Sequence, residues 1–308
     1  KLSLPINSLI AKILISNTNR ALIAVIMCSF FPFLGFWQMN IMNVLHYYLP
    51  LSFRQTELLT SSYIYADAIF LIPVGLLLDK YSVKYIFLIG LVIFNIGLFL
   101  FLISTSFTFM LAARIVCGVG HAFALICCFK LIKIIASDVT YTSLSSLVLA
   151  IAFSGGFMAQ VPTVLLLKYF SLHNALLLIL IFGILIFIAF LFLPNYESGI
   201  TKNKIKVKIL YSIFTWQNLL CSIFILTLDI PIMIFGALNG ILFLYNKHIT
   251  ITEASAVIAA LYLGTILGTV VLCYLGHRVK KKYKLIIFCN IVVILLIIYC
   301  ITWCEALL

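Results

Sequence analysis

Long apolar runs separated by short polar gaps dominate the chain. Successive runs reach about 20 residues, the length that an α-helix needs to cross about 30 Å of hydrocarbon. Because lipid offers no partner to unpaired backbone groups, we expect these runs to be helices rather than barrel strands. The pattern predicts about nine transmembrane helices, six before a polar stretch at residues 195–215 and three after it. The fold class expected is an all-α, multi-pass membrane protein.

The composition and the placement of charge agree with this interpretation. The chain is 65% hydrophobic and 9% charged, with a mean hydropathy of +1.27, which is too apolar for a water-soluble core. The net charge of +12 does not indicate nucleic acid, because the Lys and Arg residues fall in the gaps between spans. Alternate gaps hold 16 of the 20 bases, the other gaps hold three, and Arg114 lies inside a span. Positive-inside sorting then predicts a cytoplasmic N-terminus and contact with anionic lipid headgroups.

The spans divide the chain into four parts. We expect an amphipathic cytoplasmic lead at residues 1–20, a six-helix bundle at 21–194, a basic cytoplasmic linker at 195–215 and a partial bundle of three helices at 216–308. The first half also recurs in the second: Pro32 and Asn40 match Pro231 and Asn239 at an offset of 199, and Asp79-Lys80 matches His277-Arg278 at an offset of 198. Two features that share nearly one offset predict an internal repeat.

The turn between the second and third spans carries the clearest motif. It reads Gly-x-x-x-Asp-Lys-x-x-x-Lys, with Gly75, Asp79, Lys80 and Lys84 at the fixed positions. This motif resembles the loop between helices two and three of the major facilitator superfamily of secondary transporters, although Ser82 stands where the family usually has glycine. The resemblance implies a cytoplasmic gate at this turn, with a second copy at His277 and Arg278. We expect Gly75 to let two helix ends approach closely.

Two further spans carry family-like patterns. The fourth reads Arg-x-x-x-Gly-x-Gly-His, which resembles the family signature associated with proton coupling, and the fifth resembles the glycine-rich helix that packs against its counterpart in the other half. The residues expected to pack helices closely are Gly118, Gly120, Gly155, Gly156 and Pro162. A faint further likeness is to the bacterial branch similar to lysosomal dipeptide transporters. Twelve helices are typical of the family, so the chain is interpreted as a fragment or a truncated copy.

Polar side chains within the spans are the candidates for a solute site. Amides expected to line a cavity are Gln38, Asn40, Asn43, Gln160 and Asn239. The alternative is that these amides only bond to neighbouring helices. Asp67 lies about 18 Å along its helix from Asp79, beyond mid-membrane, where a carboxylate needs a cavity or a partner. Tyr63, one turn away, could donate a hydrogen bond to it.

Coupling residues are expected among Asp67, Arg114 and His121. Arg114 is the only base within a span and is the candidate cation for Asp67 or for a solute carboxylate, whereas a static pair that merely holds two helices is the alternative. A solute carrying a carboxylate, such as an amino acid, short peptide or organic anion, would suit these residues. We expect no metal and no other cofactor, since the nine cysteines lie almost wholly in spans and show no zinc spacing.

These patterns together predict a secondary transporter that works by alternating access, with protons as a second partner and a monomeric state. The expected location is the inner membrane of a bacterium. Two other classes remain open: a truncated membrane protein that transports nothing, and an intramembrane enzyme. The enzyme is less favoured because no His-Glu-x-x-His, Gly-x-Ser-x-Gly or paired-aspartate motif occurs in the chain.

Overall fold

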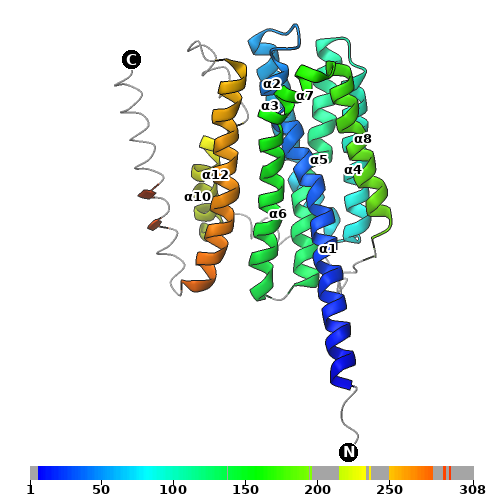
Figure 1. Cartoon of the computed structure of the whole chain (residues 1–308), viewed down its shortest axis with the longest axis vertical. Coiled ribbons are helices and arrows are strands. Elements are labelled where there is room, and N and C mark those ends of the chain that lie inside the picture. Colours follow the sequence, from blue (N-terminus) through cyan, green and yellow to red (C-terminus); the bar gives the residue numbers. More distant parts are fainter. Residues whose placement is uncertain are drawn as a thin grey trace, which may run out of the picture.

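The chain forms an upright bundle of helices (Figure 1). The computed structural model describes residues 6–136, 138–193, 195, 215–233, 236, 250–279, 287–288 and 291–292, and regular structure in these ranges is helical. The helices are α1 (Ile6–Asn40), α2 (Met42–Leu45), α3 (Phe53–Leu78), α4 (Val83–Leu102), α5 (Phe107–Ile135), α6 (Asp138–Met158), α7 (Val161–Tyr169), α8 (Leu172–Leu191), α10 (Trp216–Ile232) and α12 (Ile251–Arg278).

Seven segments of the described chain are long and apolar enough to cross a membrane. They are Leu22–Leu45, Phe53–Leu78, Val83–Leu102, Phe107–Ile135, Thr140–Met158, Leu172–Leu191 and Ile251–Gly276. The 17-residue helix α10 occupies the predicted seventh span. The predicted ninth span lies almost wholly outside the described residues, as does the basic linker. The all-α, multi-pass fold is confirmed, and the count of nine stays a prediction.

Two predicted spans are interrupted in the structure. The first span ends as α1 at Asn40 and resumes as the single turn α2. The fifth breaks at Gln160, whose backbone (φ −96°, ψ −118°) is not helical, and Pro162 then stands in the first turn of α7. Proline is tolerated there because the first turn leaves its amide groups unpaired in any case. Both breaks lie at the same end of the bundle, and they leave backbone groups without partners in their own helices.

The N-terminal lead and the first span share one helix. Helix α1 begins at Ile6 and is continuous to Asn40, so the backbone of the predicted lead joins the span without a turn. In Figure 1 its first turns project past the other helices at the lower end of the bundle.

Helix α1 lies at the centre of the N-terminal half, in contact with α5, α6 and α8. Its Phe31 ring meets the rings of Phe87 and Phe94 of α4 edge to face, with centroids 5.2 and 5.4 Å apart. Helix α5 packs tightly on α4 because Gly120 lies against the Phe94 backbone, where a Cβ would come within 2.5 Å of the Phe94 nitrogen. This packing turns the polar face of α5 toward α1 and α3.

The second half joins the first through α12, which packs along α6 (Figure 1). Gly156 of α6 lies under the ring of Tyr262, and a Cβ there would come within 2.3 Å of the ring. Gly155 faces α1 instead, against the Phe33 carbonyl oxygen. The glycines expected to pack the fifth span closely therefore do so on two sides.

The starts of α3 and α12 repeat each other. Ser52 caps α3 in a capping box with Gln55, and Thr250 caps α12 in a capping box with Glu253. The two boxes are 198 residues apart, the offset of one of the sequence matches, so local structure supports the predicted repeat. Asn239 and the side chains of Pro231 and His277 lie outside the described residues.

Candidate solute and coupling site

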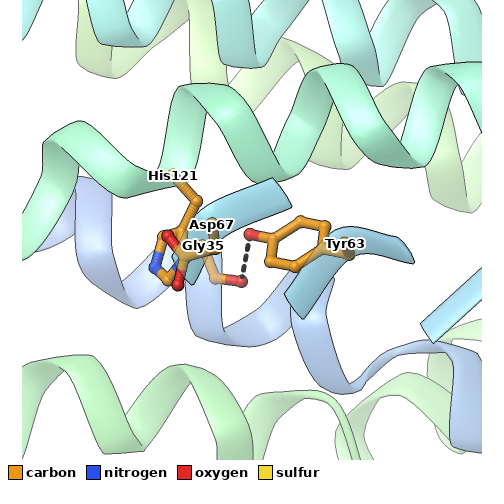
Figure 2. Close-up of polar contacts among 4 residues, drawn as sticks. All are labelled: Gly35, Tyr63, Asp67 and His121. Atoms are coloured by element: carbon orange, nitrogen blue, oxygen red, sulfur yellow. Dashed lines mark hydrogen bonds and ion pairs between the residues drawn. The ribbon is translucent and has the colours of Figure 1, made fainter. Parts of the chain in front are cut away.

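An acid and a histidine from neighbouring helices meet inside the bundle. The Nδ1 atom of His121 on α5 lies 3.3 Å from Oδ1 of Asp67 on α3, and the side chains are 4% and 22% exposed. The two groups are close enough for an ion pair, but the carboxylate lies off the direction that a hydrogen bond from the ring would need. Asp67 and His121, both predicted as coupling candidates, are therefore brought together (Figure 2).

Tyr63 connects this pair to α1. Its hydroxyl donates to the Gly35 carbonyl oxygen at 3.0 Å, and its ring lies 5.6 Å from the imidazole of His121 (Figure 2). The expected hydrogen bond from Tyr63 to Asp67 is wrong, because the tyrosine side chain directs its hydroxyl to α1 instead. Among the described residues, His121 is the partner that the acid contacts.

Glycines make this meeting of three helices possible. A Cβ on Gly35 would come within 1.9 Å of the His121 ring, and a Cβ on Gly118 would come within 2.3 Å of the Tyr63 carbonyl oxygen. Either substitution would push apart two helices. The packing role predicted for Gly118 is therefore observed. Gly35 was missed as part of the site, since its only sequence signal is a glycine near the middle of an apolar run.

Arg114 does not pair with Asp67. Its guanidinium is fully buried and donates to three backbone carbonyl oxygens, of Gln38 at 2.7 Å, Leu59 at 3.2 Å and Met39 at 3.4 Å. The ring of Tyr63 covers it at 4.5 Å. Two of these carbonyls belong to the last turn of α1, where carbonyl groups lack partners further along the helix. Arg114 therefore stabilises the break in α1, and the expectation that it faces Asp67 is corrected.

Two of the predicted cavity amides join the halves of the molecule. Asn40 Oδ1 accepts a hydrogen bond from the Tyr262 hydroxyl at 2.6 Å, and Asn43 Nδ2 donates to the Gly236 carbonyl oxygen at 2.5 Å. Asn40 also donates to the Phe36 carbonyl oxygen at 2.7 Å. Both asparagines are buried, so they act as bonds between helices in this structure. These bonds lie at the end of the bundle where α3 and α12 begin.

The two glutamines predicted to line the cavity, Gln38 and Gln160, are also buried. Gln38 Nε2 and Gln160 Oε1 have no hydrogen-bond partner among the described residues, whereas Gln160 Nε2 donates to the Gly156 carbonyl oxygen at 3.4 Å. Trp37 Nε1 donates to Thr163 Oγ1 at 2.9 Å, which sets the two glutamines at the same level of the bundle. Leaving a buried polar atom unpaired costs about 1–3 kcal/mol. Each glutamine thus retains one group that can bond to something other than its helices.

The predicted gate turn lies at the opposite end of the bundle. Asp79 Oδ1 accepts from Lys130 Nζ of α5 at 2.9 Å, with side chains 52% and 26% exposed. Lys84 Nζ donates to the carbonyl oxygen of Leu191, the last residue of α8, at 2.8 Å, and to that of Leu193 just after the helix. Two of the predicted gate residues thus tie α3 to α5 and α4 to α8.

The other members of the predicted gate contribute less. Gly75 was expected to permit a close approach, but no described atom lies within 4 Å of its Cβ position, so no close approach is seen there among the described residues. Lys80 is exposed. Arg278 lies over the ring of Tyr274 at 4.8 Å, and the side chain of His277 lies outside the described residues. A Gly264-x-x-x-Gly268 pattern in α12 likewise meets no described atom. Glycine spacing alone did not show which helix face was covered.

Comparison with known proteins identifies the family. Residues 21–304 match the model of the Major Facilitator Superfamily, so the chain belongs to that family. Membership places it among transporters rather than enzymes, and the resemblance seen in the gate turn is confirmed.

No curated protein sequence matches the chain. Among the residues that the structure describes, no cluster of three or more His, Cys, Asp or Glu side chains could hold a metal ion.

Several solved transporters share the fold. A mutant of the nucleoside transporter NupG superposes with a TM-score of 0.65 at 16% identity, covering 84% of this chain and 68% of that one. A bacterial homologue of the human lysosomal transporter Spinster, inward-facing and occupied, gives 0.62 at 17%, covering 84% and 62%. A mutant of the E. coli fucose:proton symporter FucP gives 0.56 at 16%, covering 83% and 71%. The chain therefore spans about two thirds of the length of these proteins.

Proposed function

We propose that the chain is a secondary transporter that carries a small polar solute across the membrane by alternating access, with proton movement coupled at Asp67 and His121. The observation that carries this proposal is the contact between a partly exposed acid and a buried histidine in the middle of a transporter fold. Charged groups at that depth are costly unless they serve a pathway or a partner. The solved relatives described as a nucleoside transporter and a fucose:proton symporter support the class.

The proposed coupling uses the geometry around His121. When both groups are charged, Asp67 and His121 attract each other, and the burial of His121 strengthens that attraction. Protonation of the acid or deprotonation of the imidazole removes that attraction and frees α3 to move against α5. Tyr63 is a further titratable group beside the pair, and Arg114 and Cys117 lie near Tyr63. Tyr63 passes the movement to α1 through its bond to the Gly35 carbonyl oxygen.

Alternating access requires that one end opens while the other closes. The Asn40–Tyr262 and Asn43–Gly236 bonds close the end where α3 begins, and the positive-inside pattern makes that the outer end. Asp79–Lys130 and the Lys84 contacts hold helix ends at the cytoplasmic side. In the proposed cycle the outer bonds break as the inner contacts tighten. The location that fits this orientation is a bacterial inner membrane.

Uptake into proteoliposomes tests the function. Purified protein, reconstituted in vesicles, is offered nucleosides, neutral sugars, amino acids, dipeptides and organic acids, each with and without an inward proton gradient. We expect saturable counterflow of at least one solute class and accumulation when the gradient is imposed. Vesicles with an unrelated membrane protein provide the control for leak. Absence of counterflow across the whole panel would contradict the proposal.

A further inference from the structure

The charge of the solute follows from what Arg114 does. We propose, on the basis of the proposed transport function, that the solute is an uncharged or cationic molecule with hydroxyl or amide groups, and not a carboxylate. The reasoning starts from the basic side chains. In the described spans, Arg114 is the one Lys or Arg that lies far from the helix ends.

Arg114 is not free to bind an anion. Its Nε, Nη1 and Nη2 atoms each donate to a backbone carbonyl oxygen, its face is covered by Tyr63, and the residue is 0% exposed. Turning it toward a solute would leave buried carbonyl groups at the end of α1 unpaired, and each such group costs free energy. A solute carboxylate would therefore have to compete with three bonds that already hold the fold.

Among the described residues near this level, the other groups are uncharged amides, acids, and His121, which already lies beside Asp67. The unpaired polar atoms there are a donor, Gln38 Nε2, and an acceptor, Gln160 Oε1, in fully buried side chains. Asp67 contributes negative charge beside His121, and Asp229 of α10 lies within electrostatic range of the Tyr262 hydroxyl. One amide that donates and one that accepts match hydroxyl or amide groups, which do both. Among the described residues, Arg114 is already bonded to carbonyl groups and His121 already lies beside Asp67, so an added carboxylate would meet repulsion from the acids without an unpaired cation to offset it.

Solutes that are similar in shape but differ in charge test the proposed preference against carboxylates on the wild-type protein. Thermal unfolding of purified protein is followed with D-glucose, D-glucosamine and D-glucuronate, and with nicotinamide, 3-(aminomethyl)pyridine and nicotinate. In any set that raises the unfolding temperature, we expect the neutral or amine member to do so at a concentration about tenfold lower than the carboxylate, or lower still. A carboxylate that stabilises best in its set would overturn the proposal while leaving transport itself intact.

A variant tests the role of Arg114 without any solute. Arg114→Lys keeps the positive charge, but its three donors sit on one nitrogen and cannot reach carbonyl groups that bind three separate nitrogens of the guanidinium, so we expect the unfolding temperature of the solute-free protein to fall by about 5–10 °C. Lys133→Gln, on the exposed end of the same helix, is the control and should shift it by less than about 2 °C. An unchanged unfolding temperature in Arg114→Lys would show that the arginine is available for a solute, and would overturn the proposal even if none of the six probes binds. Failure of counterflow would count against the transport function, which this variant does not address.

Discussion

The hydroxyl of Tyr262 donates to Oδ1 of Asn40 at 2.6 Å, which joins two buried residues that are 222 positions apart. Gly156 and Gly236 flank the tyrosine, and a Cβ on either would come within 2.5 Å of its ring or hydroxyl. The bond connects α12 with the end of α1 and therefore links the two halves of the molecule. Its position makes it the natural candidate for a contact that must break when the outer end opens.

Tyr262→Phe should loosen that end without unfolding the protein. The change removes one hydrogen bond and leaves a buried oxygen of Asn40 unpaired, at a cost of about 1–3 kcal/mol. We expect the backbone amides of α2 to exchange hydrogen about tenfold faster, as measured by hydrogen–deuterium exchange. Tyr274→Phe, at an exposed position of the same helix, is the control. Equal protection of α2 in both variants would mean that the bond does not hold the outer end closed.

Asp79→Asn should affect the rate of transport more than stability. The pair with Lys130 is largely exposed, and such pairs contribute about 0–1 kcal/mol to folding. If the pair instead steadies the cytoplasmic ends of α3 and α5 in one state, its loss should slow uptake severalfold while solute binding stays nearly intact. Lys130→Gln should have the same effect, and the double variant should be no slower than either single one. A full transport rate in Asp79→Asn would show that the turn is only a solvated loop.

Gly35→Ala should displace His121. The new methyl group would overlap the imidazole, and overpacking of this kind costs about 1–3 kcal/mol. We expect a lower unfolding temperature, with recovery in the double variant Gly35→Ala/His121→Ala. Gly75→Ala is the matched control, because no described atom lies near its Cβ position and the change removes backbone freedom within a helix. A Gly35→Ala protein as stable as the wild type would contradict the packing described here.

Single cysteines placed in the linker test the orientation. The bases in alternate gaps, 16 against three, predict that residues 195–208 lie in the cytoplasm. In a background whose native cysteines are replaced, a cysteine at Ser198 should react with a membrane-impermeant maleimide only after the cells are opened. A cysteine at Tyr169, which is exposed and lies between the fifth and sixth spans, should react in intact cells. Labelling of Ser198→Cys from outside would invert the topology.

Much of the fold could be predicted from the sequence, because each membrane span is a long apolar run, whereas the interruptions after Asn40 and at Gln160 were not predicted. The spacing of about 18 Å along the helix between Asp67 and Asp79 followed from helix geometry, and the expectation of a partner for Asp67 followed from the cost of a charge within the membrane. The identity of that partner did not. A guanidinium can be satisfied by main-chain carbonyls as well as by a carboxylate, and these carbonyls become available only where α1 breaks, which depends on packing.

The contacts between helices were still harder to predict from the sequence. Gly35 and Gly75 look alike in sequence, yet one lies against His121 and the other faces no described atom. Which face of a membrane helix is covered depends on its neighbours. The sequence does not show that face, because a side chain that faces lipid can be as apolar as one that packs against another helix. The bond from Tyr262 to Asn40 is of the same kind: both residues could be counted as polar, but only the fold brings them together.

Proton-driven uptake by Asp67→Asn tests the central claim most directly. The asparagine keeps the shape of the side chain but carries no charge and cannot bind and release a proton, so the charge attraction to His121 is lost at every pH. With the solute identified in proteoliposomes, we expect uphill uptake driven by a pH gradient to be lost while counterflow exchange persists, and His121→Gln should behave alike. Uptake driven by the gradient that is unchanged in both variants, or loss of folded protein in both, would contradict Asp67 and His121 as the coupling pair.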